Sequence, residues 1–378
     1  MSSFRYLGTI IDPTNASRYK STDVCFKLHR IASSDLSPGQ KLYFIRQHLI
    51  PELLHRLIHE KTLSSTLYDI DGRIRKTVKR ILGLPHSTPT SFFYLSINKG
   101  GLGLMQLRYD VPRIAVKRLV RLVNSNSWFV RAITKTKWFA NEIKRVNQLC
   151  PTNNDNQSRL MNDIRKFQDG HVNFQIGDSL VNRHISGTSR LRGDKFMKLV
   201  QLRAGMMIDH DEWCSRCNQP KTMQHLLNEC VLTKTAQGAR HNKILRGIVS
   251  HLQRYRFNWD IYREERVYFV DENGDQKYLI PDLLVVSPDS STAMCLDVGV
   301  SYETWANSLD NYDIAKRAKY GKIADNIIEW LHQQGHAHID SLATHGLIFG
   351  SRASIHNVCL KGGLSVFPPR SRRNAFSI

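Results

Sequence analysis

Four residues with metal-binding side chains lie within one short segment, and their spacing constrains the fold of this chain more than any other feature. They are Cys214, Cys217, His225 and Cys230, in the pattern C-x2-C-x7-H-x4-C. Two cysteines at a tight turn can bind one ion through both sulfurs, and a histidine and a cysteine on a following short helix can complete a tetrahedron. We therefore expect a zinc knuckle, in which Zn²⁺ is structural because four protein ligands leave no position for water.

The other cysteines favour metal binding over disulfide bonds. The chain holds 7 cysteines, an odd number, and its start, MSSFRYLGTI, lacks the basic and apolar regions of a signal peptide. We expect a cytosolic or nuclear protein with reduced thiols. The alternative to a knuckle is a chance grouping of buried thiols, and His210 or His241 fit the ligand spacing less well than His225.

Positive charge is concentrated in the first half of the chain. Of the formal net charge of +21, residues 1–200 hold 33 Lys and Arg against 14 Asp and Glu, whereas residues 201–378 hold 21 against 19. Cationic side chains release counterions from a phosphate backbone, so we expect the first half to bind nucleic acid. The alternative is a soluble basic surface. No apolar run reaches the ~20 residues of a membrane span, and we expect neither a membrane partner nor a small-molecule substrate.

The N-terminal half has the pattern of a helical domain. A short strand is expected within residues 1–11, running into a turn at Asp12-Pro13. From about residue 17 to 63 the apolar spacing is helical. One helix has Ser37 as its N-cap, Pro38 at its first position and Gln40 completing a capping box. Pro51 is expected to break or kink it.

Two further helices, at about 69–83 and 110–125, combine one apolar face with basic outer faces, which suits packing on one side and phosphate on the other. The cations of the first that we assign to nucleic-acid binding are Arg75, Lys76, Lys79 and Arg80. An ordinary solvated face is the alternative. The glycines of GGLGL, residues 100–104, lack the spacing of phosphate loops and indicate a tight turn. Residues 148–192 show little apolar periodicity, and we expect a linker with a domain boundary there.

Downstream of the expected knuckle, two apolar strands each carry one carboxylate. YLIPDLLVV contains Asp282 and MCLDVGV contains Asp297. A charge in a buried strand costs several kcal/mol unless it is paired or metal-bound. Both acids are therefore expected to converge on a divalent ion, Mg²⁺ or Mn²⁺. In the alternative, Asp282 is a turn or edge residue and Asp297 pairs with an arginine.

The spacing P-D-x14-D resembles that of the PD-(D/E)xK nucleases. These carry a lysine two residues after the second acid, where this chain has Gly299. The following helical segment, DIAKRAKYGKI, offers a lysine that can reach the same site and orient or activate the attacking water. The candidates on it are Lys316, Lys319 and Lys322, with Tyr320, and Glu303 and Glu265 are weaker additional acids.

The whole arrangement resembles the C-terminal half of the Pol polyprotein of site-specific non-LTR retrotransposons, of the type-1 retrotransposable element kind. FRYLGTIID resembles the strand after the reverse transcriptase palm, and LSPGQKLYFIRQHLIPELLHRL resembles the start of the thumb. DIDGRIRKTVKRILGLP and GGLGLMQLRYDVPRIAVKRL resemble the thumb and the region after it. The knuckle spacing matches, as do a short motif, Arg240-His241-Asn242, and the restriction-like endonuclease motifs Pro281-Asp282, Asp297 and Lys316-x3-Tyr320.

This resemblance implies target-primed reverse transcription in the nucleus after cytoplasmic synthesis, with target DNA and element RNA as partners. Asp282 and Asp297 would hold Mg²⁺, and Lys316 would assist the water, although Lys319 stays an alternative. The knuckle and the Arg240-His241-Asn242 segment would position nucleic acid beside the nuclease.

The polymerase of this family needs two adjacent aspartates, and this chain contains no Asp-Asp pair. We therefore expect a C-terminal polyprotein fragment with endonuclease but not polymerase activity. A catalytically inactive nucleic-acid-binding remnant or domesticated protein is the alternative. The expected fold is multidomain. A mostly α thumb-like region (1–147) is followed by a connecting segment (148–200), the zinc knuckle (201–235) and an α/β restriction-endonuclease-like domain (236–378). No pattern indicates an oligomeric state.

Overall fold

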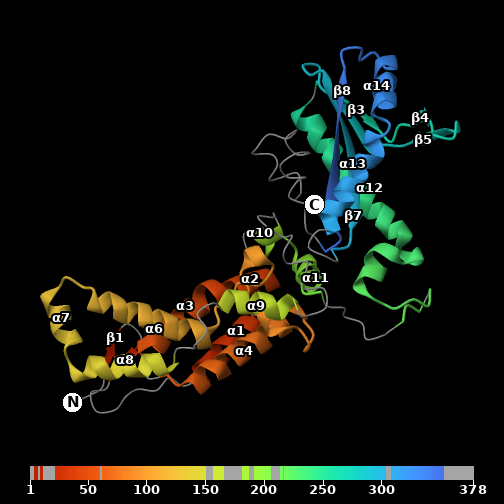
Figure 1. Cartoon of the computed structure of the whole chain (residues 1–378). Helices are drawn as coiled ribbons and strands as arrows, with labels where there is room; N and C mark the ends of the chain where they lie inside the picture. The colour runs from red at the N-terminus through yellow and green to blue at the C-terminus, as the bar shows by residue number, and fades with distance from the viewer. Residues whose placement is uncertain are drawn as a thin grey trace. The chain divides into compact units, whose positions relative to one another are not determined.

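The computed structural model describes residues 4–6, 9–11, 22–59, 62–149, 156–165, 181–186, 191–205, 213–215, 217–256, 258–303 and 308–352. The chain forms two compact units (Figure 1). Unit 1 comprises residues 1–168 and 183–206, and unit 2 comprises residues 169–182 and 207–378. The turn expected at Asp12-Pro13 and the side chain of His210 lie outside the described residues.

Unit 1 is mostly helical. Strands β1 (Phe4–Tyr6) and β2 (Thr9–Ile11) pair antiparallel, so a hairpin lies where the sequence indicated one strand. The described helices are α1 (Thr22–Ser33), α2 (Pro38–Phe44), α3 (Ile50–His59), α4 (Ser64–Leu82), α5 (Thr90–Tyr94), α6 (Leu107–Val123), α7 (Trp128–Thr134), α8 (Lys137–Leu149), α9 (Asn156–Arg165), α10 (Val181–Ser186) and α11 (Gly193–Arg203).

The start of α2 and the effect of Pro51 follow from local chemistry. The Ser37 N–H donates to Gln40 Oε1 at 2.9 Å, and Pro38 occupies the first helical turn, where no N–H is needed. Between α2 and α3 the chain forms one π-helical turn, Ile45–Leu49. A proline lacks the N–H and crowds the carbonyl four residues before it. The wider turn before Pro51 takes the place of the expected break or kink.

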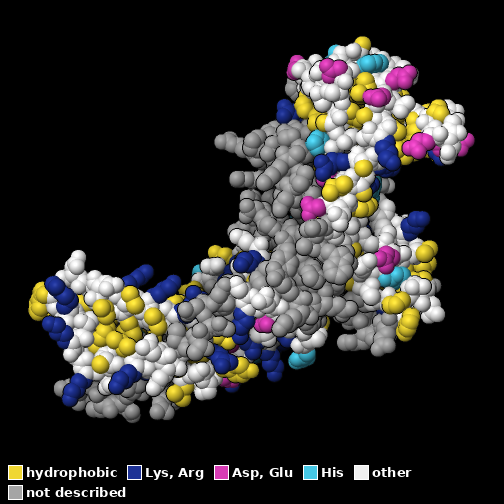
Figure 2. Space-filling model, in the orientation of Figure 1, with side chains coloured by type: hydrophobic (Ala, Val, Ile, Leu, Met, Phe, Trp, Pro, Cys, Tyr) yellow, Lys and Arg dark blue, Asp and Glu magenta, His cyan; other side chains and the backbone are white. Residues whose placement is uncertain are grey.

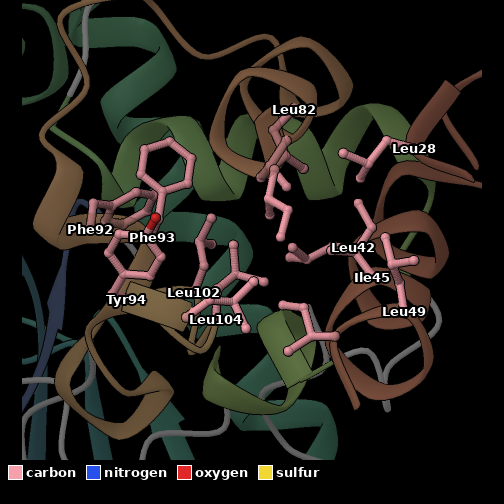
Figure 3. Packing of buried hydrophobic residues seen from close by; sticks show 14 of the residues in the cluster. Leu28, Leu42, Ile45, Leu49, Leu82, Phe92, Phe93, Tyr94, Leu102 and Leu104 are labelled. Carbon is pink, nitrogen blue, oxygen red and sulfur yellow. The ribbon is translucent and has the colours of Figure 1, made fainter. Parts of the chain in front are cut away.

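The core of unit 1 gathers apolar side chains from helices far apart in sequence. Figure 3 shows Leu28, Leu42 and Ile45 facing Leu82, with the aromatic rings of α5 beside them. Further along the chain from α5, the GGLGL segment (residues 100–104) forms the expected tight turn. Gly103 has a φ of 65°, and a Cβ at Gly101 would lie 2.2 Å from Leu95 O.

Helices from the expected connecting segment 148–200 also contribute to this core. Leu160, Ile185, Phe196 and Val200 are all buried in it. The Arg46 guanidinium donates to the backbone carbonyls of Ile185 and Ser186, at 3.3 and 2.6 Å. The described helices of this segment therefore pack in unit 1 rather than form an exposed linker, while divisions between the units fall at residues 168/169 and 182/183, inside the range where a boundary was expected. These helices are short, and their described side chains bury only a few apolar residues, too few to produce a recognisable period in the sequence.

Unit 2 contains a small mixed sheet. The described elements of unit 2 are the π turn η4 (His225–Glu229), the 3₁₀ turn η5 (Val231–Thr233), α12 (Lys234–Tyr255), β3 (Asp260–Arg263), β4 (Val267–Val270), β5 (Gln276–Leu279), β6 (Leu283–Val286), β7 (Thr292–Ser301), α13 (Ser308–Gly321), α14 (Ala324–Gln333) and β8 (Ser341–Gly350). The strand order is β3-β6-β7-β8, and β4 and β5 form a separate hairpin.

Strands β3, β6 and β7 pair antiparallel, whereas β7 and β8 pair parallel over ten residues. Helices cover both faces of the sheet. Leu283 and Val285 of β6 pack in a cluster with α12, and Leu284 and Val286 pack in a second cluster with α14. This two-sided burial explains why β6 is a continuous apolar run rather than an alternating one. None of the helices in the described ranges is long and apolar enough to cross a membrane.

Candidate metal centres and nuclease site

The four ligands of the expected knuckle lie together in unit 2. Their ligand atoms are all within 4.8 Å of one another. The Sγ atoms of Cys214 and Cys217 are each 3.9 Å from Cys230 Sγ, and Cys217 Sγ is 3.1 Å from His225 Nε2. In a tetrahedron with Zn–S bonds of ~2.3 Å the sulfurs are about 3.8 Å apart, whereas a disulfide needs about 2.05 Å. The residues present therefore fit Zn²⁺.

Backbone hydrogen bonds hold the ligands in this arrangement. The Cys214 N–H donates to Gln219 O at 2.8 Å, and the Asn218 N–H donates to Cys214 O at 3.0 Å. Asn218 has a φ of 53°, in the left-handed region that asparagine tolerates. The Cys230 N–H closes the π turn by donating to His225 O at 2.7 Å. Each half of the ligand set is fixed by its own turn.

The knuckle is attached to the strands that carry the acids. Asn228 Nδ2, from η4, donates to Val300 O of β7 at 3.0 Å. Arg240 of α12 donates from a guanidinium nitrogen to Leu227 O, also at 3.0 Å. Burial lowers the pKa of Arg240, and Glu303 opposes this effect. The Arg240 side chain thus supports η4 and also lines a groove of unit 2, and its expected role in nucleic-acid binding stays a prediction.

The two acids face each other across adjacent strands. Leu283 pairs with Leu296 in the β6–β7 ladder, which places Asp282, just before β6, beside Asp297. Asp282 Oδ2 accepts the Val298 N–H at 2.6 Å. Burial opposes ionisation of Asp282, but its hydrogen bonds to His241 and Val298 outweigh this and lower its pKa. Asp297 is only 3% exposed, and burial and the charge of Asp282 raise its pKa.

Helix α13 brings a lysine and a tyrosine to Asp297. Lys316 Nζ forms an ion pair with Asp297 Oδ2 at 2.5 Å. The Tyr320 hydroxyl lies 3.1 Å from Asp297 Oδ1 and 2.9 Å from Ile280 O, and accepts from Lys319 Nζ at 3.0 Å. Burial lowers the pKa of Lys316, but Asp297 outweighs it and the net shift is upward. Lys316 therefore touches the acid, whereas Lys319 touches the tyrosine.

His241 and Asn242 reach the other acid from α12. His241 Nε2 lies 3.2 Å from Asp282 Oδ2, and its Nδ1 lies 3.2 Å from Asn242 Oδ1. The hydrogen bond to Asp282 raises the pKa of His241 to about 9, against the effect of burial. From the sequence we assigned His241 and Asn242 to nucleic-acid binding, and only the fold shows that His241 lies against an acid 41 residues away.

A groove of about 590 Å³ opens between the knuckle and these side chains. Asn228 and Gln237 line its knuckle side, and His241, Tyr312 and Lys316 line the side that leads to the acids. The four knuckle ligands and the two aspartates are not among its described lining residues, so the groove lies beside both candidate centres rather than containing either.

At Gly299, where the PD-(D/E)xK nucleases carry a lysine, there is no room for a side chain in this structure. A Cβ at this position would lie 2.5 Å from Tyr312 Cε1 and 2.8 Å from Ile348 Cδ1. Tyr312 is one helical turn before Lys316, whose Nζ lies 5.6 Å from the centre of the tyrosine ring. The absence of a side chain on β7 is thus what lets α13 lie close enough to supply the lysine.

The weaker candidates lie elsewhere. Glu303 is fully buried and accepts the Arg352 N–H at 3.1 and 3.3 Å. Glu265 and Lys322 are exposed. The structure brings none of the three to the pair of aspartates.

In unit 1 the basic residues expected to bind nucleic acid lie together on α4. A hollow of about 590 Å³ is lined by Arg75, Lys76, Lys79, Arg80 and His86, with no acid among its described lining residues. Arg75 donates to the Tyr94 hydroxyl at 2.6 Å, and Lys79 donates to His86 O at 2.7 Å. Burial and the neighbouring Arg75 lower the pKa of Lys79. The hollow is a concentrated positive site.

Similarity to known proteins links this geometry to mobile elements. No protein-family model matches the chain. A retrovirus-related Pol polyprotein from type-1 retrotransposable element R2 of Popillia japonica is 27% identical over 333 residues, which cover 83% of this chain and 45% of that protein. A protein of the same name from Nasonia vitripennis is 25% identical over 70% of this chain and 26% of its own length. The type-2 element R2DM of Drosophila melanogaster has a Pol polyprotein 26% identical over 66% of this chain and 25% of its own length.

The chain is a homologue of R2 retrotransposon Pol polyproteins. The resemblance seen in the motifs is thereby confirmed. The chain spans about half the length of two of the Popillia japonica relatives, 45% and 54%.

Proposed function

We propose that unit 2 is a metal-dependent DNA endonuclease of the PD-(D/E)xK type, which nicks target DNA for target-primed reverse transcription in the nucleus. The observation that carries this proposal is the convergence of Asp282, Asp297 and Lys316, from two adjacent strands and one helix. The relatives are retrotransposon Pol polyproteins, which supports DNA and RNA as partners.

The donor set suits a hard divalent cation. Asp282 and Asp297 would hold Mg²⁺ or Mn²⁺, which prefer carboxylate oxygens. When bound, such an ion activates a water and neutralises charge on the scissile phosphate. Burial raises the pKa of Asp297, and repulsion between the two neighbouring carboxylates adds to this rise. A cation between them would remove this repulsion.

The surrounding side chains have separate tasks. The Lys316 ammonium, kept charged by Asp297, can orient the attacking water and offset charge on the phosphate oxygens. The Tyr320 hydroxyl lies where it can fix Asp297, and His241 holds Asp282. The zinc knuckle would fix one wall of the groove that admits DNA.

A catalytically inactive nucleic-acid-binding protein would need the basic hollow of α4 but not this arrangement. The placement of a half-buried lysine against a buried acid, beside Asp282 of the neighbouring strand, favours the nuclease.

Nicking of supercoiled plasmid by the full chain, with Mg²⁺ or Mn²⁺, tests the proposal. Asp282→Ala and Asp297→Ala should abolish nicking, and Lys316→Ala should lower its rate by roughly 10²-fold or more. Lys322→Ala and Glu265→Ala are matched controls, because both side chains are exposed and away from the acids. No metal-dependent nicking by a folded wild type, or equal nicking by every variant, would refute the proposal.

A further inference from the structure

One end of unit 1, formed by α6, α7 and α8, exposes large apolar side chains. Trp128, Phe129 and Trp138 are 76%, 59% and 61% exposed, and Val120 and Val123 are also exposed. Figure 2 shows hydrophobic side chains gathered over this end, with Lys and Arg around them. Single exposed apolar residues are ordinary, but a group of this size on consecutive elements marks an interaction site. We call these five residues and the basic residues between them the aromatic–basic surface.

The two aromatic residues of α7 form a rigid pair. The Trp128 and Phe129 rings are 5.9 Å apart at 83°, an edge-to-face arrangement. Both lie in the first turn of the short helix α7, and Trp138 is the second residue of α8. Tryptophan and phenylalanine rings have few torsions to fix, so they present flat surfaces at a small entropic cost. Each ring buries ~150–250 Å² when it is covered.

The charge around these rings identifies what covers them. Residues 113–145 hold nine Lys and Arg and a single acid, Glu142. That acid is already engaged, because Glu142 Oε1 lies 2.5 Å from an Arg145 guanidinium nitrogen. Arg131, Lys135 and Lys137 are exposed between the aromatic residues. The partner must therefore be anionic and must also offer flat apolar faces.

Unpaired nucleic acid has both properties. Its phosphates suit the cations, and its bases are free to stack on aromatic rings, which is how proteins bind single strands without reading sequence. In a duplex the bases are stacked inside the helix and cannot cover a tryptophan. We propose that the aromatic–basic surface binds unpaired nucleotides of RNA or DNA, as a site separate from the basic hollow on α4 and from the nuclease centre of unit 2.

The test measures binding of the full chain to fluorescent oligonucleotides without Mg²⁺, so that no strand is cut. The probes are unpaired oligo(U) and oligo(dT) of about twenty nucleotides and a duplex of the same length. The Trp128→Ala/Trp138→Ala double variant should bind both unpaired probes at least about tenfold more weakly. Its duplex affinity should change by less than about twofold. The ratio between the two unpaired probes tells which nucleic acid the surface prefers.

Two further variants make the result specific. Phe26→Ala removes a ring that is 65% exposed in α1 of the same unit, and it should leave all affinities unchanged. Lys135→Gln/Lys137→Gln should reduce the slope of log affinity against log salt for the unpaired probes by about 1.4, at ~0.7 per cation. The first expectation holds because Phe26 lies outside the aromatic–basic surface, and the second because Lys135 and Lys137 would contact phosphates there.

Three outcomes would overturn the proposal. One is an unchanged affinity of the double tryptophan variant for unpaired probes, and another is an equal loss for the duplex. The third is that the double variant loses self-association, or binding to vesicles of phosphatidylcholine and phosphatidylserine, while oligonucleotide binding stays intact. Nicking by unit 2 is expected to be the same in all these variants, so failure here is distinct from failure of the nuclease proposal.

Discussion

Replacing Gly299 by alanine should separate the position of Lys316 from its chemistry. The new Cβ would lie 2.5 Å from Tyr312 Cε1 and 2.8 Å from Ile348 Cδ1. Carbon atoms in contact are normally ~3.5–4.0 Å apart. Tyr312 must therefore move by about 1 Å, together with the turn of α13 that carries Lys316.

The magnitude follows from this displacement. Overpacking of this kind costs about 1–3 kcal/mol of stability, and the smaller conformational freedom of unfolded alanine returns about 0.4–1 kcal/mol. We expect a net loss of about 1–2 kcal/mol in the free energy of unfolding. A 1 Å misplacement of a group that acts on the reacting atoms can cost roughly 10²-fold in rate. The nicking rate of Gly299→Ala should therefore fall much more than its stability.

Urea unfolding and single-turnover nicking, measured on the same preparations, check this expectation. Gly321→Ala is the matched control, because a Cβ there meets nothing within 4 Å and it lies on the same helix. Adding Tyr312→Ala to Gly299→Ala removes the principal clash and should restore part of the nicking rate. Nicking by Gly299→Ala at the wild-type rate would contradict this expectation, as would a double variant that nicks DNA no faster than Gly299→Ala.

Three other expectations follow. Cys214→Ser should lower bound zinc from about one per chain to near zero, measured on the purified protein, and unchanged zinc would refute the ligand set. Asp71, which caps α6 through two backbone N–H groups, has a pKa raised by burial from 3.8 to about 6. As the pH falls from about 6 to 3.8, the folded state binds a proton at Asp71 before the unfolded state does. The free energy of unfolding of the wild type, measured in urea, should therefore rise by up to about 3 kcal/mol relative to that of Asp71→Asn. A difference between the two proteins that stays constant with pH would contradict this. Lys76→Gln/Arg80→Gln should reduce the salt slope of duplex binding by about 1.8, and an unchanged slope would exclude phosphate contact there.

Features that depend on neighbouring residues could be read from the sequence. The spacing of the four knuckle ligands and the apolar runs around Asp282 and Asp297 are local patterns, and the structure places these residues together. The capping box at Ser37 and the glycine turn at residues 100–104 are local in the same way.

Features that depend on the fold could not be read in this way. His241 meets Asp282 across 41 residues, and Lys316 rather than Lys319 meets Asp297 because of how α13 packs on Gly299. One turn of helix separates the two lysines, so periodicity cannot distinguish them. The hydrogen bond from Arg240 to the Leu227 carbonyl likewise depends on where η4 lies.

The parallel pairing of β7 with β8 makes the proposed nuclease centre dependent on a strand that supplies neither of its two aspartates. Asp297 pairs with Gly346, 49 residues further along the chain, and all ten residues of β7 have a partner in β8. While the protein is being synthesised, both acids and Lys316 leave the ribosome before β8 does. We therefore expect the proposed metal centre to assemble only once β8 has been synthesised, after the helices of unit 1 have had time to fold.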